Sequence, residues 1–534
     1  MARLLRQPGF FDVSGFVAME QPRVWSQCSD WVKDPDLRRQ WWAAMVAGLA
    51  ALFPLLMSVD LYIDDIARAM DGSLGWVRVG RPLADALVGW LNFGHPVTAV
   101  APLNTVVAIV LLSAVGVACA RAYGIRSPFW TAMASLPLMA QPYALQALSY
   151  GFDAVFMAAA LAAAVVAALL VNAQGRWRHV AVALVLQLVA FNLYQPAANG
   201  FLVMTGCLII AASLGLLHPT WQRQSLRARL LVSAAVYGGG YGLYRLLFAL
   251  FFEHRLNRYA SSAAAFKPLD WQLPWALLGS ALEPIQQVLR DFGAWPVVLP
   301  LILLLLIYAG LLRAVCGWRT MARVLAFSVV VLLLAPGGMV LLRESFVRHP
   351  RVLLYFGPLL TSLILQILVL TRLQGRRIWR LGVLPLVWLM VVVSYAYGHA
   401  FAAQVSFEQG RLSRIVAAAS TLAAREDQPP AQFLMVEGIM PRSPVLTNTV
   451  RKFPVIDRLI PPLLNGNQTF SFSQLRLYGL ALEKRRPEDL NEGWPKGCDP
   501  SPDAICTSEF SLQRAGADTL VLQLAPGSEV RPET

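Results

Sequence analysis

Residues 154–171 read AVFMAAALAAAVVAALLV, a stretch without a single charged or amide side chain. A helix needs about 20 mostly apolar residues to cross the hydrocarbon core of a bilayer, so this stretch predicts a transmembrane helix. Ten more stretches of similar character occur along the chain. The predicted spans are 41–59, 97–120, 129–140, 154–171, 180–193, 198–217, 230–252, 295–312, 324–342, 353–370 and 381–397.

The composition agrees with a membrane protein. Of the 534 residues, 57% are hydrophobic and only 14% are charged, whereas about a quarter of the residues of a soluble protein are charged. This balance excludes a string of soluble domains, a disordered chain, a collagen and a disulfide scaffold. We therefore expect a polytopic α-helical membrane protein with about eleven transmembrane helices and some water-exposed mass.

The net charge of +14 is concentrated among the apolar segments. The chain carries 31 basic and 16 acidic residues before Phe401, and 14 basic and 15 acidic residues from Phe401 onward. Positive charge between membrane spans is typical of cytoplasmic loops. The charge therefore indicates membrane topology, and no nucleic-acid partner is expected.

The loops between the predicted spans alternate in charge. If the N-terminus is cytoplasmic, every inner loop is basic and carries no acid, whereas the outer loops carry nearly all the acidic residues of this region. This asymmetry predicts that the C-terminus lies outside. The first 40 residues lack the apolar run of a signal peptide, so we interpret residues 1–40 as a cytoplasmic N-terminal segment.

Together with this N-terminal segment, three domains are expected from these patterns. Residues 41–398 form the transmembrane domain, with outer loops at 60–96 and 253–294, and residues 399–534 form a small extracytoplasmic α/β domain. Within the latter, 432–436 and 519–524 are predicted strands and 410–424 a predicted helix. The amphipathic stretch 271–289 is expected to lie along the membrane surface.

Two cysteines stand close together in the C-terminal domain. Cys498 and Cys506 are separated by few residues and have no histidine near them. Because the outside of a bacterial cell membrane is oxidising, the pair predicts a disulfide.

The segment after the first span carries the most conspicuous acidic residues. It reads Asp60-Leu-Tyr-Ile-Asp64-Asp65-Ile-Ala-Arg68. One interpretation is a solvated loop with a helix N-cap at Asp64 or Asp65. The other is a functional carboxylate pair, because two adjacent carboxylates repel each other and raise the pKa of one, which makes it a candidate general base.

Further polar motifs fall at the outer ends of the spans. They are Gly80-Arg81-Pro82, Gln141-Pro142-Tyr143, Ser149-Tyr150-Gly151-Phe152-Asp153 and Asn192-Leu193-Tyr194-Gln195-Pro196. Each motif alone is explained by helix capping or by interface chemistry. Together they place several polar side chains in one outer layer, which has no counterpart at the inner ends.

In order and spacing, these motifs resemble those of the bacterial glucosyltransferase II family, which comprises the serotype-converting O-antigen glucosyltransferases and their relatives. The resemblance is clearest over residues 60–198 and implies a GT-C type membrane fold. It also implies a multi-pass protein of the bacterial inner membrane with a periplasmic C-terminal domain. The implied reaction moves a sugar, glucose in the family, from a polyprenyl-phosphate donor to a lipopolysaccharide glycan on the periplasmic face.

The resemblance also implies roles for particular residues. The acidic pair Asp64 and Asp65 is the implied catalytic centre, one carboxylate acting as the base and the other orienting it or the acceptor. The substrate-binding candidates among the motifs are Arg68, Arg81, Tyr150, Asp153, Tyr194 and Gln195.

A departing lipid phosphate requires cations. The loop Arg343-Glu344-Ser-Phe-Val-Arg348-His349-Pro350-Arg351 is dominated by cations although it is predicted to lie outside, and arginine presents a planar fork of donors to phosphate. Arg343, Arg348 and Arg351 are therefore candidate phosphate ligands, with Arg245 as another. The alternative is that they anchor lipid headgroups. Asp64 and Asp65 could also hold Mg²⁺ or Mn²⁺, although two ligands are few for such a site.

A transporter or flippase of lipid-linked glycans is the alternative from another functional class. It would explain the many spans, and polar residues would then line a transport path. However, the ionisable residues gather at the outer ends rather than at mid-membrane, and the two halves of the chain do not repeat. The pattern therefore favours a glycosyltransferase.

Overall fold

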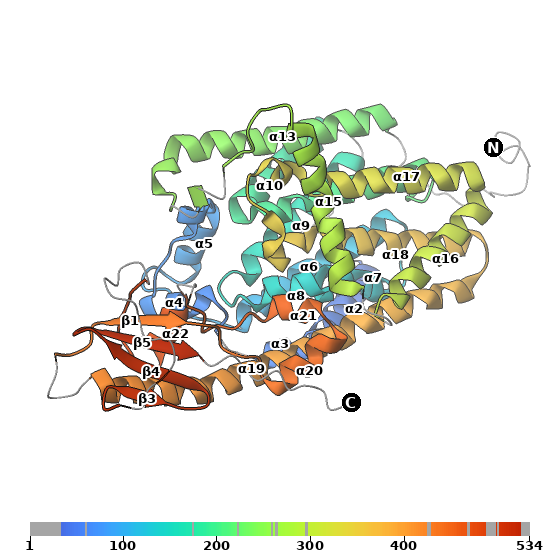
Figure 1. Cartoon of the computed structure of the whole chain (residues 1–534). Helices are drawn as coiled ribbons and strands as arrows, with labels where there is room; N and C mark the ends of the chain where they lie inside the picture. Colours follow the sequence, from blue (N-terminus) through green and yellow to red (C-terminus); the bar gives the residue numbers. More distant parts are fainter. Residues whose placement is uncertain are drawn as a thin grey trace, which may run out of the picture.

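The chain folds into a helical bundle joined to a five-stranded sheet, as a computed structural model shows (Figure 1). The structure describes residues 34–58, 61–173, 176–221, 224–257, 260–261, 265–293, 297–423, 429–466, 470–486, 498 and 501–524. Asp60, most of the N-terminal segment 1–40 and the end of the first predicted span lie outside the described residues.

Long apolar helices build the bundle. They are α2 (Pro35–Ala51), continued by α3 (Phe53–Met57), then α6 (Leu103–Ala122), α7 (Pro128–Ala140), α9 (Ala154–Ala173), α10 (Trp177–Leu193), α12 (Gly200–Ser213), α13 (Leu226–Phe251), α16 (Leu299–Cys316), α17 (Trp318–Leu334), α18 (Phe356–Leu373) and α19 (Leu384–Ala423). Every predicted span overlaps one of these helices. Within the described residues, 6 helices are long and apolar enough to cross a membrane, so the number eleven stays a prediction.

Short helices cap the end of the bundle that faces the sheet, here called the sheet-side end. They are α4 (Asp64–Asp71), η2 (Trp76–Val79), α5 (Pro82–Leu91), α8 (Pro142–Ser149), α11 (Gln195–Ala198), η6 (Phe346–Arg348) and η7 (Pro350–Tyr355). The other 3₁₀ turns are η3 (Pro219–Trp221), η4 (Glu253–Arg255), η5 (Gly337–Leu341) and η8 (Arg377–Val383). The motifs singled out in the sequence all fall on or beside these caps.

Small residues allow the bundle helices to approach closely, as is common between membrane helices. A Cβ atom at Gly116 of α6 would lie 2.0 Å from the Ser135 hydroxyl of α7, and one at Gly398 of α19 would lie 2.6 Å from Pro54 Cβ of α3. The second contact holds the start of α3, the helix that precedes the acidic segment in the sequence.

The C-terminal sheet has the strand order β2-β1-β5-β4-β3. Its strands are β1 (Phe433–Glu437), β2 (Glu483–Lys484), β3 (Ala504–Cys506), β4 (Phe510–Ala515) and β5 (Thr519–Leu524). β1 pairs in parallel with β2 and β5, while β4 pairs antiparallel with β3 and β5. The two predicted strands are confirmed. Cys498 and Cys506 are joined by a disulfide, with Cα atoms 5.8 Å apart.

The bundle and the sheet share one helix. α19 runs without a break through the predicted domain boundary at residue 398, and its last part, Leu412 to Leu422, belongs to the core of the sheet. Helices α20 (Pro444–Lys452) and α21 (Val455–Leu459), by contrast, bury their apolar residues in the core of the bundle, while α22 (Phe470–Leu477) packs near α4. The C-terminal part is therefore integrated with the sheet-side end of the bundle.

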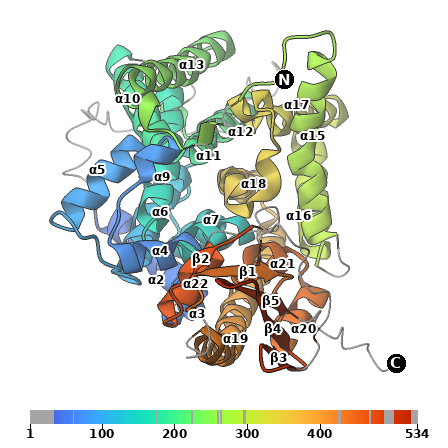
Figure 2. The ribbon, with the colours of Figure 1, turned by 60° about the vertical axis from the view of Figure 1, so that its left-hand side comes forward.

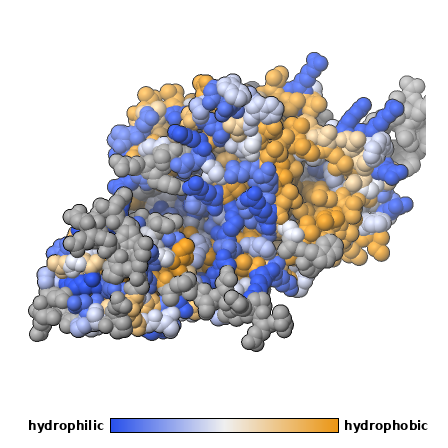
Figure 3. All heavy atoms as spheres, viewed as in Figure 1, coloured by the Kyte–Doolittle hydropathy of each residue, from blue (hydrophilic) through white to orange (hydrophobic). Residues whose placement is uncertain are grey.

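The hydropathy of the surface changes along the direction from the bundle to the sheet. Hydrophobic residues cover the region around α16 and α17, and a hydrophilic band lies between this region and the sheet, where hydrophilic and hydrophobic residues are mixed (Figure 3). The amphipathic helix α15 (Leu273–Phe292) runs across the direction of α13 and α17 (Figures 1 and 2). A helix is thus present where the sequence predicted a surface helix.

Candidate active site

The acidic pair divides into one exposed and one buried carboxylate. Asp64 begins α4 and is exposed, whereas Asp65 is 1% exposed and its Oδ2 accepts a hydrogen bond from the backbone N–H of Gly151 at 2.7 Å. Burial, and next the negative charge of Asp153, raise the pKa of Asp65 to about 7, although the Gly151 bond and Arg68 oppose this shift. The two neighbours therefore have different environments.

The backbone before the pair is strained. Ile63 has φ +49° and ψ −103°, a region that a β-branched residue rarely occupies and that costs about 1–3 kcal/mol. Such strain persists only where the surroundings fix it, and it often accompanies functional sites. Here it lies directly before the exposed Asp64.

Asp153 is the centre of a buried cationic cluster. It is 3% exposed. Its Oδ1 accepts from Trp76 Nε1 at 2.6 Å and from Arg81 at 3.3 Å, and its Oδ2 accepts from Arg68 at 3.2 Å. The Arg68 guanidinium also lies 4.2 Å from the centre of the Trp76 ring. One carboxylate thus holds two arginines at the sheet-side end, beside the segment that Asp65 binds.

Arg351 approaches the pair from another part of the chain. Its guanidinium lies 4.3 Å from the centre of the Tyr150 ring, and Asp64 is the carboxylate whose charge acts most strongly on it. The His349 ring also interacts electrostatically with Asp64. The exposed carboxylate therefore lies within electrostatic range of the Arg351 guanidinium.

Two of the arginines retain unused donors. Arg81 Nε and Arg351 Nη1 are buried and have no hydrogen-bond partner within the described residues. A buried donor without a partner costs about 1–3 kcal/mol, and guanidinium donors bind phosphate oxygens well. Arg81 is also placed 4.6 Å from the ring centre of Tyr194. These two N–H groups are the best-placed candidates for an anionic ligand.

Gln195 stabilises the Gly80-Arg81 turn through hydrogen bonds; its contacts in the described part of the chain are not with a charged side chain. Its side-chain amide donates to Gly80 O and to the Tyr244 hydroxyl, and that hydroxyl donates to Gly80 O at 2.9 Å. Gly80 has φ +80°, so a side chain at this position would be strained. Gln195 thereby helps to direct Arg81 toward Asp153.

The structure leaves three predicted arginines away from these contacts. Arg343 and Arg348 are exposed, and the backbone N–H of Arg343 donates to Ala265 O. Arg245 lines a separate cavity of about 230 Å³ together with Glu253 and Phe266. Of the four arginines proposed from the sequence as phosphate ligands, only Arg351 joins the cluster around the acidic pair.

The described part of the chain contains no group of three or more His, Cys, Asp or Glu residues that could hold a metal ion. Both oxygens of Asp153 bind arginine or tryptophan donors, so this carboxylate is not available as a third ligand beside Asp64 and Asp65.

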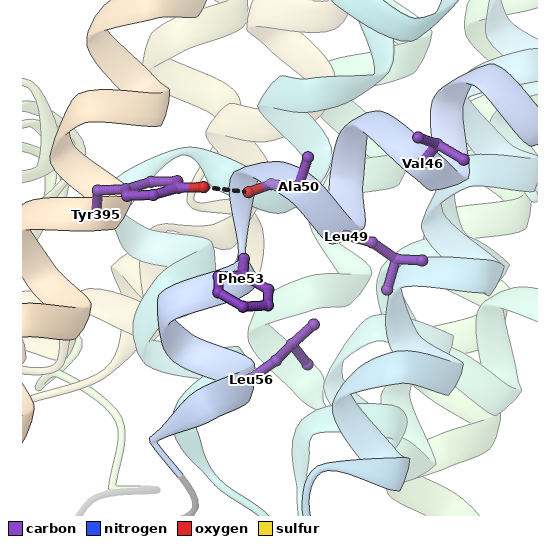
Figure 4. A pocket seen from close by; sticks show the side chains of 6 residues that line it. All are labelled: Val46, Leu49, Ala50, Phe53, Leu56 and Tyr395. Carbon is purple, nitrogen blue, oxygen red and sulfur yellow. Dashed lines mark hydrogen bonds between the residues drawn. The ribbon is translucent and has the colours of Figure 1, made fainter.

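An apolar groove lies on the flank of the bundle between α2, α3 and α19. It has a volume of about 520 Å³ and is lined by Val46, Leu49, Ala50, Phe53, Leu56 and Tyr395 (Figure 4). The Tyr395 hydroxyl donates to Ala50 O at 3.0 Å across one end of it. Six residues further along α19, Phe401 packs against Tyr62 with ring centres 5.6 Å apart. Six residues of helix span about 9 Å, so the groove approaches the acidic segment.

Some residues at this site were not assigned a role from the sequence. Trp76 binds Asp153, and Gln146 contacts both Tyr62 and Arg351. Gln146 is 2% exposed in an otherwise apolar helix, and a buried amide needs partners. A glutamine among apolar residues is therefore the feature of the sequence that could have identified Gln146 as a site residue.

An acidic pair and a cationic cluster thus lie together at one end of a bundle that contains helices long and apolar enough to cross a membrane. Comparison with known proteins specifies the class: residues 38–362 match the family described as Glucosyl transferase GtrII, and the chain belongs to this family. This membership confirms the resemblance that the motifs indicated.

A curated relative is similar over part of its length. It is an uncharacterized 55.3 kDa protein in the gtrB 5' region of Salmonella phage P22, which is 30% identical over 167 residues. The match covers 31% of this chain and 34% of that protein, so the chain spans about a third of the length of this relative. No solved structure matches the chain.

Proposed function

We propose that the protein transfers a glucosyl group from a polyprenyl-phosphate donor to a cell-surface glycan such as O-antigen, on the periplasmic face of the bacterial inner membrane. The observation that carries the proposal is the exposed Asp64 carboxylate opposite Arg351, whose Nη1 is buried without a partner among the described residues. A base and a phosphate ligand close to each other are what such a transfer needs.

The reaction requires few protein groups. An acceptor hydroxyl oxygen attacks the anomeric carbon of the sugar, and its proton passes to the Asp64 carboxylate. The bond between the anomeric carbon and the phosphate oxygen breaks, and the polyprenyl phosphate leaves with the electron pair. Arg351 and Arg81 stabilise the negative charge that develops on this leaving group.

Asp65 serves to position the site. It is buried and holds the backbone of Gly151, and this places Tyr150 and Asp153 on either side of it. Tyr150 packs against Arg351, and Asp153 binds Arg68 and Arg81. Asp64 is therefore assigned as the base and Asp65 as the residue that orients the cationic side of the site.

The groove supports a lipid-linked donor. Its lining is apolar, and α19 connects it to the Tyr62 segment. An isoprenoid chain in this groove would bring its phosphate toward Arg351. A soluble nucleotide sugar would have no use for such a groove.

Purified protein in lipid nanodiscs tests the proposal. We expect transfer of radiolabelled glucose from polyprenyl-phosphate glucose to O-antigen, and no transfer from UDP-glucose. Transfer from UDP-glucose alone would contradict the donor assignment. Movement of lipid-linked glycan across vesicles without any new glycosidic bond would favour the flippase alternative.

A further inference from the structure

A short segment of the C-terminal part contacts the segment that leads into the acidic pair. It consists of α21 with its last residues Arg458 and Leu459. The Tyr62 hydroxyl donates to Leu459 O at 2.5 Å. Tyr62 is buried and stands two residues before Asp64, so this bond connects α21 to the strained backbone that presents the base.

Gln146 extends the connection to Arg351. Its amide nitrogen donates to the Tyr62 hydroxyl at 3.1 Å and to Arg458 O at 3.5 Å. Its amide oxygen accepts from the backbone N–H of Arg351 at 2.8 Å. One buried side chain therefore joins the base segment, α21 and the residue that carries the unpartnered guanidinium N–H.

Arg458 fixes α21 through its side chain. The guanidinium forms an ion pair with Asp291 at 2.6 Å and also donates to Val347 O. Asp291 is 3% exposed and accepts two further hydrogen bonds at 2.9 Å, from the Tyr143 hydroxyl and from Gln287. A buried carboxylate held by three donors is fixed in position. Removing its charged partner would leave an uncompensated buried charge, which costs free energy of folding.

These contacts join five separate segments of the chain: 62–64, 143–146, 287–291, 347–351 and 458–459. This inference rests on the proposed function. We propose that Arg458 is a positioning residue for donor binding, and that α21 holds Arg351 and the Tyr62–Asp64 segment in a fixed position relative to each other. The C-terminal part is then a component of the donor site.

The chain offers a matched control on the same helix. Asp457 pairs with Arg442 at 2.6 Å, but these side chains are 38% and 43% exposed. Exposed pairs contribute little to stability. Arg442→Gln therefore removes an ion pair of α21 without touching the segments that carry Tyr62 and Arg351.

The test compares Arg458→Lys, Arg458→Gln and the double variant Arg458→Met/Asp291→Asn with this control. The double variant leaves no unpaired buried charge, and the asparagine side chain that replaces Asp291 keeps an acceptor for Tyr143, which protects the fold. In full-length protein in nanodiscs we measure KM for polyprenyl-phosphate glucose, KM for the glycan, and hydrogen–deuterium exchange.

We expect Arg458→Gln and the double variant to raise the donor KM about tenfold or more and to leave the acceptor KM unchanged. Arg458→Lys retains part of the donor affinity, and Arg442→Gln matches the wild type. Amide exchange in segments 62–66 and 347–353 is expected to be faster in the two disruptive variants, because their buried hydrogen bonds are released.

Unchanged exchange in both segments would overturn the proposal, whatever the activity. A rise of the acceptor KM alone would overturn it as well and would assign Arg458 to the glycan. If wild-type protein transfers sugar from no polyprenyl-phosphate donor, the proposed function fails, and the exchange measurement alone decides whether α21 positions these segments.

Discussion

Asp65 and Gly151 are joined across 86 residues of sequence by a 2.7 Å hydrogen bond from the glycine N–H to the carboxylate. This bond attaches the first acidic segment to the turn that carries Tyr150 and Asp153. Under the proposed function, the buried aspartate holds this turn, and the exposed aspartate is the one that meets a substrate.

Asp64→Asn should abolish transfer while the protein inserts and folds normally. Removal of a general base typically lowers the rate by about 10²–10⁴-fold, and asparagine cannot take a proton from the acceptor. The measurement is kcat with saturating polyprenyl-phosphate glucose. Asp71→Asn, at the exposed end of the same helix, is the control and should retain the wild-type rate. Full activity of Asp64→Asn would remove Asp64 from the mechanism.

The raised pKa of Asp65 predicts a pH-dependent stability. Its value of about 7 in the folded protein, against an ordinary value of 3.8, means that the folded state favours the protonated form. The contribution is stabilising below about pH 4 and is lost as the pH rises through about 7. Asparagine mimics the protonated group and still accepts from Gly151.

Asp65→Asn should therefore raise the melting temperature relative to wild type at about pH 8, and the difference should disappear near pH 4. Thermal melts in detergent at both values provide the measurement, with Asp71→Asn as the reference. A variant that is less stable than wild type at the higher pH would show that the charged form of Asp65 is the favoured one.

Arg351→Ala should weaken donor binding more than either Arg343→Ala or Arg348→Ala. A hydrogen bond to a charged group is worth about 1.5–3 kcal/mol, which corresponds to a factor of about ten to a hundred or more in affinity. Arg351→Lys should restore only part of it, because lysine lacks the planar fork. Equal effects of all three alanine variants on binding of polyprenyl phosphate would instead favour general anchoring of lipid headgroups.

The helices were predictable because each depends on local composition. The stretch 154–171 needs no partner to be recognised as apolar, and the apolar run in 519–524 indicates a strand in the same way. The continuity of α19 was not evident, because Gln404 and Glu408 look like the end of an apolar segment. In the structure Gln404 donates to Glu408 at 2.8 Å and both are buried against the C-terminal part.

The candidate site was predictable only where its residues cluster in sequence. The motifs around Asp64, Arg81 and Asp153 each stand out at the end of an apolar segment. Gln146, Asp291 and Arg458 do not, because their partners lie far away in the chain: Arg458 and Asp291 are 167 residues apart. A single sequence contains no signal of such pairings.

The side of the membrane on which the sheet lies is predicted from loop charge. Fusion of alkaline phosphatase, which is active only in the periplasm, after Thr534 should give an active reporter, and a cytoplasm-active fluorescent reporter should stay dark. The opposite pattern would place the sheet and the whole sheet-side end in the cytoplasm. Fusions after Leu193, in a predicted outer turn, and after Leu373, in a predicted inner loop, would then locate the error.

The groove predicts a dependence on the length of the donor lipid. An undecaprenyl donor can contact the lining from Val46 to Leu56, whereas a lipid of two isoprene units is too short to fill it. Because the lipid tail already lies in an apolar bilayer, the gain comes from van der Waals packing against the lining rather than from transfer out of water, and wild-type protein should prefer the long donor by KM. Val46→Trp places a large side chain at the groove and should lower this preference while transfer from the short donor continues.

Val329→Trp, on an exposed face of α17, introduces the same side chain elsewhere and should behave like wild type. If Val46→Trp keeps the full preference for the long donor, the lipid chain binds elsewhere; if both donors lose transfer equally, the substitution has disturbed α2 rather than the groove.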